Sequence, residues 1–565
     1  MSSDWWKSAV VYQIYPRSFQ DSNGDGIGDL PGIRSRLGHL QDLGVDVLWL
    51  SPIYASPHAD NGYDISDYHA IDPAFGTMED FDALLAEVHE RGMKLVMDLV
   101  VNHTSDEHPW FLESRSSRRS PKRDWYWWRP PREGFAAGDV GAEPTNWRAF
   151  FSGSTWELDE ESGEYFLHLF HPKQPDLNWE NREVRQAVYA MMRWWLDKGV
   201  DGFRMDVINL ISKELPLRDG APLPGGLGNG FPLYANGPRM HAYLQEMRRE
   251  VFDGRDAELL TVGETPGITT DEALLITDPA RRELDMVFQF EHVDVDHGPG
   301  GKFDPQPLDL VRLKSILGRW QHELGERGWN SLYWDNHDQP RVVSRFGDDR
   351  DHWAASAKAL AAVLHLQRGT PYVYQGDELG MTNAGFTSID QFRDIESLNA
   401  YDELRALGVG EERVLDGLSA MSRDNARTPV QWTAGPHAGF TSGTPWIDVP
   451  ANHAWLNAEA QVEDPDSVFN FYRSLIDLRH GEAVVSHGSF AMLLPEHPRV
   501  FAFRRELDGS VMTVAANLSG EPVDVDIDLG AARLVLHNQG VAVDPPPVVG
   551  PMHLAPWEAR VYLAR

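Results

Sequence analysis

Short hydrophobic runs recur along this chain and alternate with longer segments of helical periodicity. Runs of this length, rich in valine, leucine and tyrosine, are typical of buried strands in a parallel sheet. Segments such as 79–91 and 182–198 carry apolar residues three and four positions apart, as amphipathic helices do. The alternation predicts an α/β fold, a (β/α)8 TIM barrel. Its eight predicted strands are residues 9–14, 45–50, 95–101, 202–207, 259–264, 286–290, 331–335 and 371–374.

The gap between the third and fourth runs, residues 102–201, is too long for one helical connection. Its first part contains WYWWRPP and the alternating GEYFLHLF, which predict loops and short strands. After residue 481 the pattern changes to apolar/polar alternation with turns, which is typical of an antiparallel sheet. We therefore expect a barrel in two parts, 1–103 and 174–481, with a small inserted domain at 104–173 after the third strand. A C-terminal antiparallel β-domain, a β-sandwich, should follow at 482–565.

A Gly/Pro-rich loop at 220–238 follows the fourth predicted strand. Long loops at the carboxyl ends of barrel strands usually line the functional site. We therefore expect this loop to line the site.

Composition narrows the partners of the protein. The 565 residues carry a formal charge of −35, which disfavours nucleic acid and anionic membranes and suits a neutral substrate, although such a charge more often reflects simple solubility. The absence of cysteine excludes disulfides and thiolate catalysis. No signal-peptide pattern opens the chain, and no apolar stretch reaches 18 residues. We predict a cytoplasmic monomer with no membrane or nucleic-acid partner.

Three acidic residues, Asp206, Glu264 and Asp338, each follow a predicted strand, in GFRMD, LLTVGE and SLYWDNHD. Barrel enzymes keep their chemistry at these strand ends. Cleavage of a glycoside with retention needs one carboxylate to attack the sugar and a second carboxyl group to protonate the leaving oxygen. The pattern therefore predicts a glycosidase-type site.

The surroundings of the first two carboxylates differ. Arg204 lies two residues before Asp206, so on a strand both point to one face, and the cation should keep Asp206 ionised as a nucleophile. An Arg-x-Asp pair on a strand is equally often a structural ion pair. Glu264 has apolar neighbours, which should raise its pKa and suit it to proton donation.

Histidines occur at two further strand ends, His103 after Asn102 and His337 after Asn336. A lone histidine is more often a core residue than a ligand, but two at strand ends favour binding of sugar hydroxyls. No HExxH spacing occurs, so no catalytic metal is predicted.

The segment DSNGDGIGD places oxygen-bearing side chains at alternate positions, as the first part of a calcium loop does. Its twelfth position is Gly32 instead of the glutamate of an EF-hand. A calcium loop and a simple Asp/Gly-rich turn both remain open on spacing alone.

Six motifs together resemble the α-amylase family, glycoside hydrolase family 13, over essentially the whole chain, and more narrowly its oligo-1,6-glucosidase and α-glucosidase branch. They are QIYPRSF, DLVVNHTS, GFRMDVIN, VGET, WDNHDQPR and SRDNARTPVQW. The resemblance implies that Asp206 is the nucleophile, Glu264 the acid/base and Asp338 the stabiliser of the distorted sugar. It implies a glucose pocket in which Asp64 and Arg423 clamp the non-reducing end, Tyr63 stacks beneath the ring, and His103, Arg204 and His337 complete the wall. It also implies a structural Ca²⁺ held by Asp21, Asn23, Asp25, Ile27 and Asp29, with no organic cofactor.

The residue after the nucleophile bears on which bond is cut. In this branch a valine there goes with α-1,6 links, and alanine or threonine with α-1,4 links; here it is Val207. Its β-branched bulk should narrow the pocket beside the scissile bond. Glu396 in RDIESLN is expected, by resemblance, to contact the leaving sugar.

We expect an exo-acting, retaining α-glucosidase that removes glucose from short neutral α-1,6-linked oligosaccharides such as isomaltose and panose. One alternative is an α-1,4-preferring α-glucosidase. Another is a glucosyl-transferring or isomerising enzyme of the trehalose or isomaltulose synthase type, which would share the same three carboxylates. A non-catalytic amylase-like partner protein is disfavoured because the three carboxylates are complete.

Overall fold

The computed structural model describes residues 4–255, 258–540 and 551–565. Its centre is a parallel sheet of eight strands in the order β13-β12-β9-β5-β2-β1-β17-β16. A parallel bridge between Val287 and Asn330 joins the two edge strands, so the sheet closes into a barrel. All eight predicted strands are confirmed: β1 (Val11–Ile14), β2 (Val47–Leu50), β5 (Lys94–Val100), β9 (Gly202–Asp206), β12 (Leu260–Glu264), β13 (Met286–Phe288), β16 (Ser331–Leu332) and β17 (Thr370–Tyr374).

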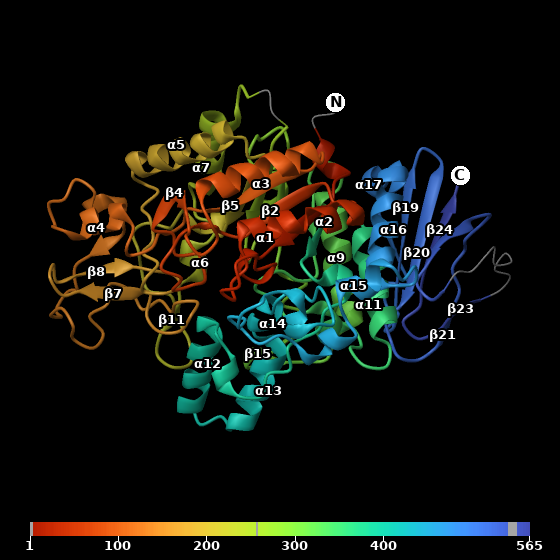
Figure 1. The fold of residues 1–565 in the computed structure, drawn as a ribbon. Helices are drawn as coiled ribbons and strands as arrows, with labels where there is room; N and C mark the ends of the chain where they lie inside the picture. The colour runs from red at the N-terminus through yellow and green to blue at the C-terminus, as the bar shows by residue number, and fades with distance from the viewer. Residues whose placement is uncertain (1–3, 256–257, 541–550) are drawn as a thin grey trace.

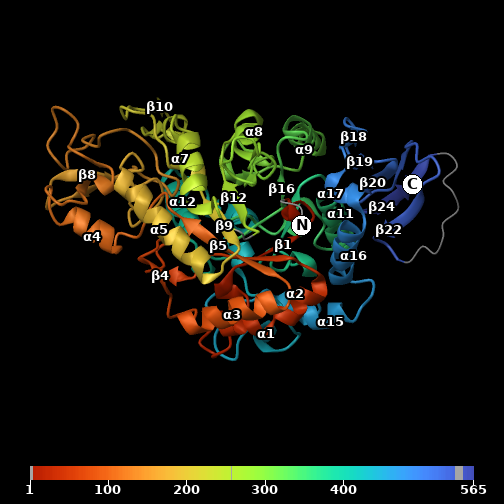
Figure 2. The ribbon, with the colours of Figure 1, turned by 90° about the horizontal axis from the view of Figure 1, so that it is seen from above.

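Helices cover the outside of this barrel (Figures 1 and 2). α5 is an example of how these helices begin and end. At its start, the Asn181 side chain accepts a hydrogen bond from the Glu183 backbone N–H. At its end, Gly199 takes φ 113°, a left-handed cap that suits glycine. The outer helices are α1 (Leu30–Ser35), α2 (Leu37–Leu43), α3 (Met78–Glu90), α5 (Arg182–Lys198), α7 (Met240–Met247), α8 (Thr270–Thr277), α9 (Leu310–Leu324), α11 (Trp353–His365) and α16 (Val468–Gly481).

The insertion after β5 and the C-terminal sheet lie on opposite sides of the barrel in both views (Figures 1 and 2). The insertion contains α4 (Pro109–Arg115) and a sheet in the order β6-β8-β7, formed by β6 (Trp128–Arg129), β7 (Trp156–Asp159) and β8 (Glu164–Leu167). β8 coincides with the alternating GEYFLHLF pattern. The predicted domain boundaries themselves stay predictions.

The C-terminal region forms two antiparallel sheets, as the alternation predicted. A five-stranded sheet has the order β18-β19-β20-β24-β22, and β21 pairs with β23. Val500 and Ala515 of the larger sheet and Val523 and Leu554 of the smaller one share one apolar cluster. The strands are β18 (Ala491–Leu493), β19 (Val500–Leu507), β20 (Ser510–Asn517), β21 (Val523–Val525), β22 (Arg533–His537), β23 (Met552–Leu554) and β24 (Ala559–Ala564).

Two helices after β17, α12 (Ile395–Ala406) and α13 (Glu411–Met421), project from the barrel beside β15 (Gly301–Pro305) (Figure 1). A helical pattern there was not among the predicted elements. No helix in the described parts of the chain is long and apolar enough to cross a bilayer.

Candidate active site

The two strands that carry Asp206 and Glu264 lie unusually close together. Gly202 opens β9 at φ 144°, and a Cβ at that position would lie 1.9 Å from the Leu260 carbonyl oxygen of β12. Only glycine permits this approach. Asp206 and Glu264 are the last residues of these adjacent strands, so both carboxyl groups reach the same end of the barrel, as predicted.

One guanidinium joins three buried carboxylates at this end. Arg204, 1% exposed, donates from Nη1 to Asp98 at 2.9 Å and to Asp206 at 2.6 Å. Its Nη2 lies 2.7 Å from Glu264 Oε2. Asp98 pairs with Arg204 in the β5–β9 register, although sequence reasoning did not select it. One guanidinium and a hydrogen bond between the two carboxyl groups hold Asp206 and Glu264 close together, as a retaining enzyme requires.

Burial sets the proton affinities of these two groups. It raises the pKa of Glu264 to about 8, against the opposing effect of Arg204. It raises the pKa of Asp206 to about 7, although Arg204 and a hydrogen bond with Glu264 both lower it. The elevated pKa of Glu264 agrees with our expectation. The expectation that Arg204 alone keeps Asp206 ionised is too simple, because the cation offsets only part of the cost of burial.

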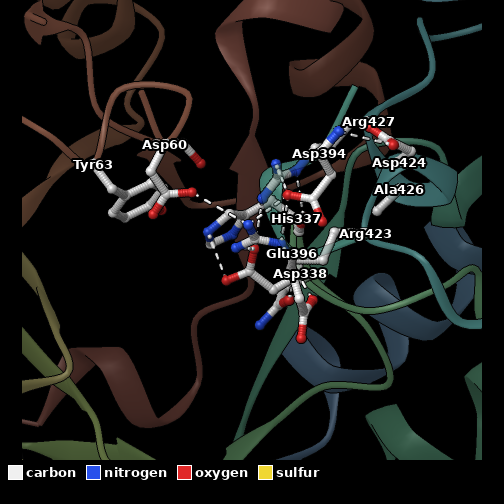
Figure 3. A network of polar contacts seen from close by, with 12 residues as sticks. Asp60, Tyr63, His337, Asp338, Asp394, Glu396, Arg423, Asp424, Ala426 and Arg427 are labelled. Atoms are coloured by element: carbon white, nitrogen blue, oxygen red, sulfur yellow. Dashed lines mark hydrogen bonds and ion pairs between the residues drawn. The ribbon is translucent and has the colours of Figure 1, made fainter. Parts of the chain in front are cut away.

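Asp338 lies six residues beyond the short strand β16, and arginines hold it in place (Figure 3). Its Oδ1 accepts from Arg427 at 2.7 Å and from Arg423 at 3.2 Å. Burial acts to raise the pKa of Asp338, but His337 and these two arginines outweigh it and lower the pKa far below its ordinary value. Asp338 is therefore an anion at any working pH. Arg427 was not predicted as a site residue, because nothing in the motif SRDNART distinguishes it from Arg423.

Asp394 is the other anchor of this network (Figure 3). It is fully buried, caps the first turn of α12 and accepts from Arg423 Nε at 2.9 Å and Arg427 Nη1 at 3.3 Å. Burial acts to raise the pKa of Asp394, but Arg423 and Arg427 lower it to about 2. No periodic pattern in the sequence predicted Asp394 as a site residue.

The residue that faces Arg423 across the pocket is Asp60, which corrects the prediction for Asp64. Arg423 Nη2 donates to Asp60 Oδ1 at 3.2 Å (Figure 3). The Asp64 carboxylate instead accepts the backbone N–H groups of Ala59 and Asp60 at 2.8 and 3.0 Å, so it holds the loop from behind. Both aspartates belong to the segment ADNGYD, and spacing alone could not separate the residue in the pocket from the one in its support.

Tyr63 and His103 line the same pocket, as predicted, whereas His337 is fully buried behind Tyr63. Tyr63 stacks on His337 with centroids 5.1 Å apart and planes 6° apart, and its hydroxyl donates to Asp98 at 3.0 Å. The Gln13 amide donates to His337 Nδ1 at 2.8 Å, so the ring proton lies on Nε2, 3.3 Å from Asp338. Burial lowers the pKa of His337 to about 3, and the ring is a neutral donor.

His103 is also neutral, since burial lowers its pKa to about 4. Its Nε2 lies 3.2 Å from both the Tyr63 carbonyl oxygen and the Gln174 side-chain nitrogen. It lines the pocket beside the aromatic ring of Phe170.

Val207 has a left-handed backbone, with φ 35° and ψ 42°. This conformation is unfavourable for a β-branched residue and marks a constrained position. It directs the Val207 N–H to Glu264 Oε2 at 3.0 Å while the residue lines the pocket wall. One residue thus orients the proposed proton donor and shapes the space next to it.

The outer wall comes from the inserted domain on one side and from β15 and α12 on the other. Phe150, Phe151 and Phe170 line it on the first side. On the second, Lys302 Nζ lies 2.6 Å from Glu396 Oε2. The pocket between these walls measures about 190 Å³ and is open to solvent.

The Gly/Pro-rich loop 220–238 was expected to line the site, but no residue of it lines this cavity. It packs instead behind the wall, where Phe231 and Tyr234 lie 6.3 and 6.2 Å from the ring of Phe150. The prediction for this loop was wrong because the inserted domain lies between it and the pocket.

In the segment DSNGDGIGD, Asp21, Asn23 and Asp25 each accept the backbone N–H two residues ahead through Oδ1, at 2.8 to 2.9 Å. Such successive turns bring oxygen donors at alternate positions to one loop, which fits a calcium ligand set. Asp29 lies outside this series, since its carboxylate accepts from Ser22 and from Gly32 and caps α1. Among the described residues, no three His, Cys, Asp or Glu side chains gather as a metal site.

Comparisons with known proteins agree with this geometry. The sequence profile described as "Alpha amylase, catalytic domain" matches residues 13–488. The chain is 54% identical to an oligo-1,6-glucosidase of Halalkalibacterium halodurans over 100% of both sequences. It is 48% identical to a trehalose-6-phosphate hydrolase of Bacillus subtilis, covering 99% of this chain and 98% of that one. An isomaltulose synthase from Klebsiella sp. LX3 has a structure that superposes with a TM-score of 0.94, at 42% identity over 99% of each chain.

Proposed function

This chain belongs to the α-amylase family of glycoside hydrolases, and we propose that it is a retaining, exo-acting α-glucosidase that cleaves α-1,6 links of short oligosaccharides. The observation that carries the proposal is the pair of carboxyl groups bridged by Arg204: Asp206 at 2.6 Å and Glu264 at 2.7 Å. Retention needs two carboxyl groups about 5 Å apart, whereas inversion needs a wider gap.

The reaction follows from the different proton affinities of the two groups. Asp206 attacks the anomeric carbon and forms an ester, while Glu264 gives its proton to the departing glycosidic oxygen. Water then attacks the same carbon, Glu264 takes the water's proton, and the ester bond to Asp206 breaks. Burial raises the pKa of Glu264, and a hydrogen bond with Glu264 lowers the pKa of Asp206, so the proton starts on Glu264, the group that must donate it. Asp338, an anion held by Arg423 and Arg427, binds the sugar hydroxyls as positive charge develops in the ring.

Exo action is supported by the closed inner end of the pocket. The Asp60–Arg423 pair crosses it at 3.2 Å, and Asp338 and Asp394 share the same guanidinium. A chain could not pass through this network, so a sugar enters by its non-reducing end and stops there. Asp60 and Arg423 then bind its terminal hydroxyls, and Tyr63 packs against the ring.

The α-1,6 preference is supported by Val207 on the pocket wall and by the oligo-1,6-glucosidase of H. halodurans, 54% identical over the whole length. The test is a comparison of kcat/KM for isomaltose and maltose, with NMR detection of the anomer released first. We expect higher kcat/KM for isomaltose and initial release of α-glucose. Preference for maltose would refute the linkage assignment, and initial release of β-glucose would refute retention.

Glucosyl transfer or isomerisation is the second candidate, supported by the 0.94 TM-score to an isomaltulose synthase. The same ester would form, and a sugar in place of water would take the glucosyl group. Product analysis on sucrose, maltose and isomaltose at high concentration separates the two functions.

We further propose a structural Ca²⁺ at the loop of Asp21, Asn23 and Asp25, with the Ile27 carbonyl as a further donor. Bound there, the ion would neutralise carboxylates far from the reaction and stabilise the loop. The chain carries no cysteine and a charge of −35, which support a cytoplasmic location. A monomer is the simplest state, and cell fractionation and gel filtration test these two proposals.

A further inference from the structure

α12 links the proposed sugar pocket to the inserted domain. Its capping residue, Asp394, binds Arg423, and Glu396 in its first turn pairs with Lys302. One and two turns further on, Asn399 and Glu403 lie four residues apart and therefore on one face. Both bind a single segment of the inserted domain, residues 148–152.

The contacts bracket the two phenylalanines of that segment. Glu403 accepts from Arg148 Nη1 and Nη2 at 2.6 and 2.7 Å, a bidentate pair, and from the Ser152 hydroxyl at 2.6 Å. Asn399 Nδ2 donates to the Phe151 carbonyl oxygen at 2.8 Å. Ser152 has φ 76°, so the segment turns sharply just after the aromatic pair.

The bracketed residues form the outer wall of the pocket. Phe150 stacks on Phe170 with centroids 4.8 Å apart and planes 11° apart. Phe151 lies 4.9 Å from the guanidinium of Arg423, which is the arginine that binds Asp60 and Asp338. Any shift of residues 148–152 would therefore move this wall of the pocket.

Polar contacts join this wall to α12. Ser397 is the one fully buried residue of α12, and Leu398, Tyr401 and Leu404 of the same helix pack partly buried against an apolar cluster that includes Leu418. The side chains of Arg148 and Glu403 keep 35% and 33% of their exposure, so solvent screens part of this ion pair and reduces its contribution to global stability.

We propose that Glu403 is a positioning residue that, through Arg148 and Ser152, holds the Phe150–Phe151 wall against the leaving-sugar site and so determines how well that sugar is bound. This inference rests on the proposed α-glucosidase function. The leaving-sugar site binds the neutral sugar that is linked to the glucosyl unit, and this neutral sugar packs on the aromatic wall. Loss of the contacts between Glu403 and residues 148–152 should therefore lower activity on substrates with a leaving sugar and leave activity unchanged on a substrate without one.

The test compares isomaltose with α-glucosyl fluoride, whose leaving group is too small to reach the wall. In E403Q we expect kcat/KM for isomaltose to fall about tenfold, mainly through KM, with kcat/KM for the fluoride unchanged. D402N, which alters an exposed carboxylate next in sequence on the same helix, should leave both substrates unaffected. The charge-swapped double variant R148E/E403R should recover part of the isomaltose activity.

An equal loss on both substrates, or wild-type kinetics for E403Q, would overturn the inference. A wild-type enzyme that does not cleave isomaltose would instead count against the proposed linkage, and the same comparison is then made with the disaccharide it does cleave. Thermal unfolding of E403Q within about 2 °C of wild type excludes a folding defect, as expected for a pair that solvent partly screens.

Discussion

Replacement of Glu264 by glutamine should stabilise the folded protein at pH 8 while removing its activity on disaccharides. Burial raises the pKa of Glu264 from 4.5 to about 8. Because the folded-state pKa is the higher one, this group favours the folded state fully below about pH 4.5 and loses that contribution as the pH rises to about 8. At 1.36 kcal/mol per pKa unit, the loss reaches at most about 4 kcal/mol at pH 8.

Glutamine can take the place of the protonated acid without repacking. Glu264 Oε2 accepts from the Val207 N–H at 3.0 Å and lies 2.7 Å from Arg204 Nη2, and the amide oxygen can accept both bonds. The amide nitrogen then replaces the protonated oxygen that faces Asp206. The E264Q variant thus keeps these hydrogen bonds and loses only the carboxyl group whose protonation changes with pH.

The assay is thermal unfolding of wild type and E264Q between pH 5 and pH 8, with E90Q, a change at the exposed end of α3, as the control. We expect the Tm difference between E264Q and wild type to be small at pH 5 and to grow to a few degrees at pH 8. The E90Q difference should stay flat. A Tm advantage of E264Q that does not change with pH, or an E264Q protein less stable than wild type at pH 8, would refute the assignment of Glu264 as a buried acid of raised pKa.

D206N should lower kcat on isomaltose by on the order of 10⁴-fold with an unchanged circular dichroism spectrum, and activity near wild type would exclude Asp206 as the nucleophile. D60N should raise KM for isomaltose about tenfold or more with little change in Tm. D64N should instead lower Tm, because the Asp64 carboxylate accepts hydrogen bonds from two backbone N–H groups. The reverse pattern would show that Asp64, and not Asp60, lies in the pocket. V207A should lower the isomaltose-to-maltose ratio of kcat/KM about tenfold or more, and an unchanged ratio would remove Val207 as the determinant of linkage. Chelation by EDTA should lower Tm by a few degrees, with recovery on addition of Ca²⁺ but not after D21N, and an insensitive Tm would remove the calcium proposal.

The barrel itself could be predicted from the sequence because its signals are local. Eight short apolar runs and the helical patterns between them depend only on side chains near one another in the chain, and all eight strands form. Asp206 and Glu264 could be predicted for the same reason, since each is the last residue of its strand. The helix over residues 395–406 was missed because one buried residue is too little to create an apolar stripe.

Which residues pair with the charged groups of the site depends on contacts between segments that are far apart in the sequence. Arg423 lies 363 residues from Asp60 and 29 from Asp394, and only folding shows that Asp60, and not Asp64, faces it. Proton affinities also depend on burial, which outweighs Arg204 and leaves Asp206 with a pKa of about 7. The sequence by itself therefore determined the barrel, the inserted segment and the positions of the residues proposed to carry the chemistry. Tertiary structure decided which charges meet, because low-dielectric burial and hydrogen-bond geometry arise only when those segments pack together.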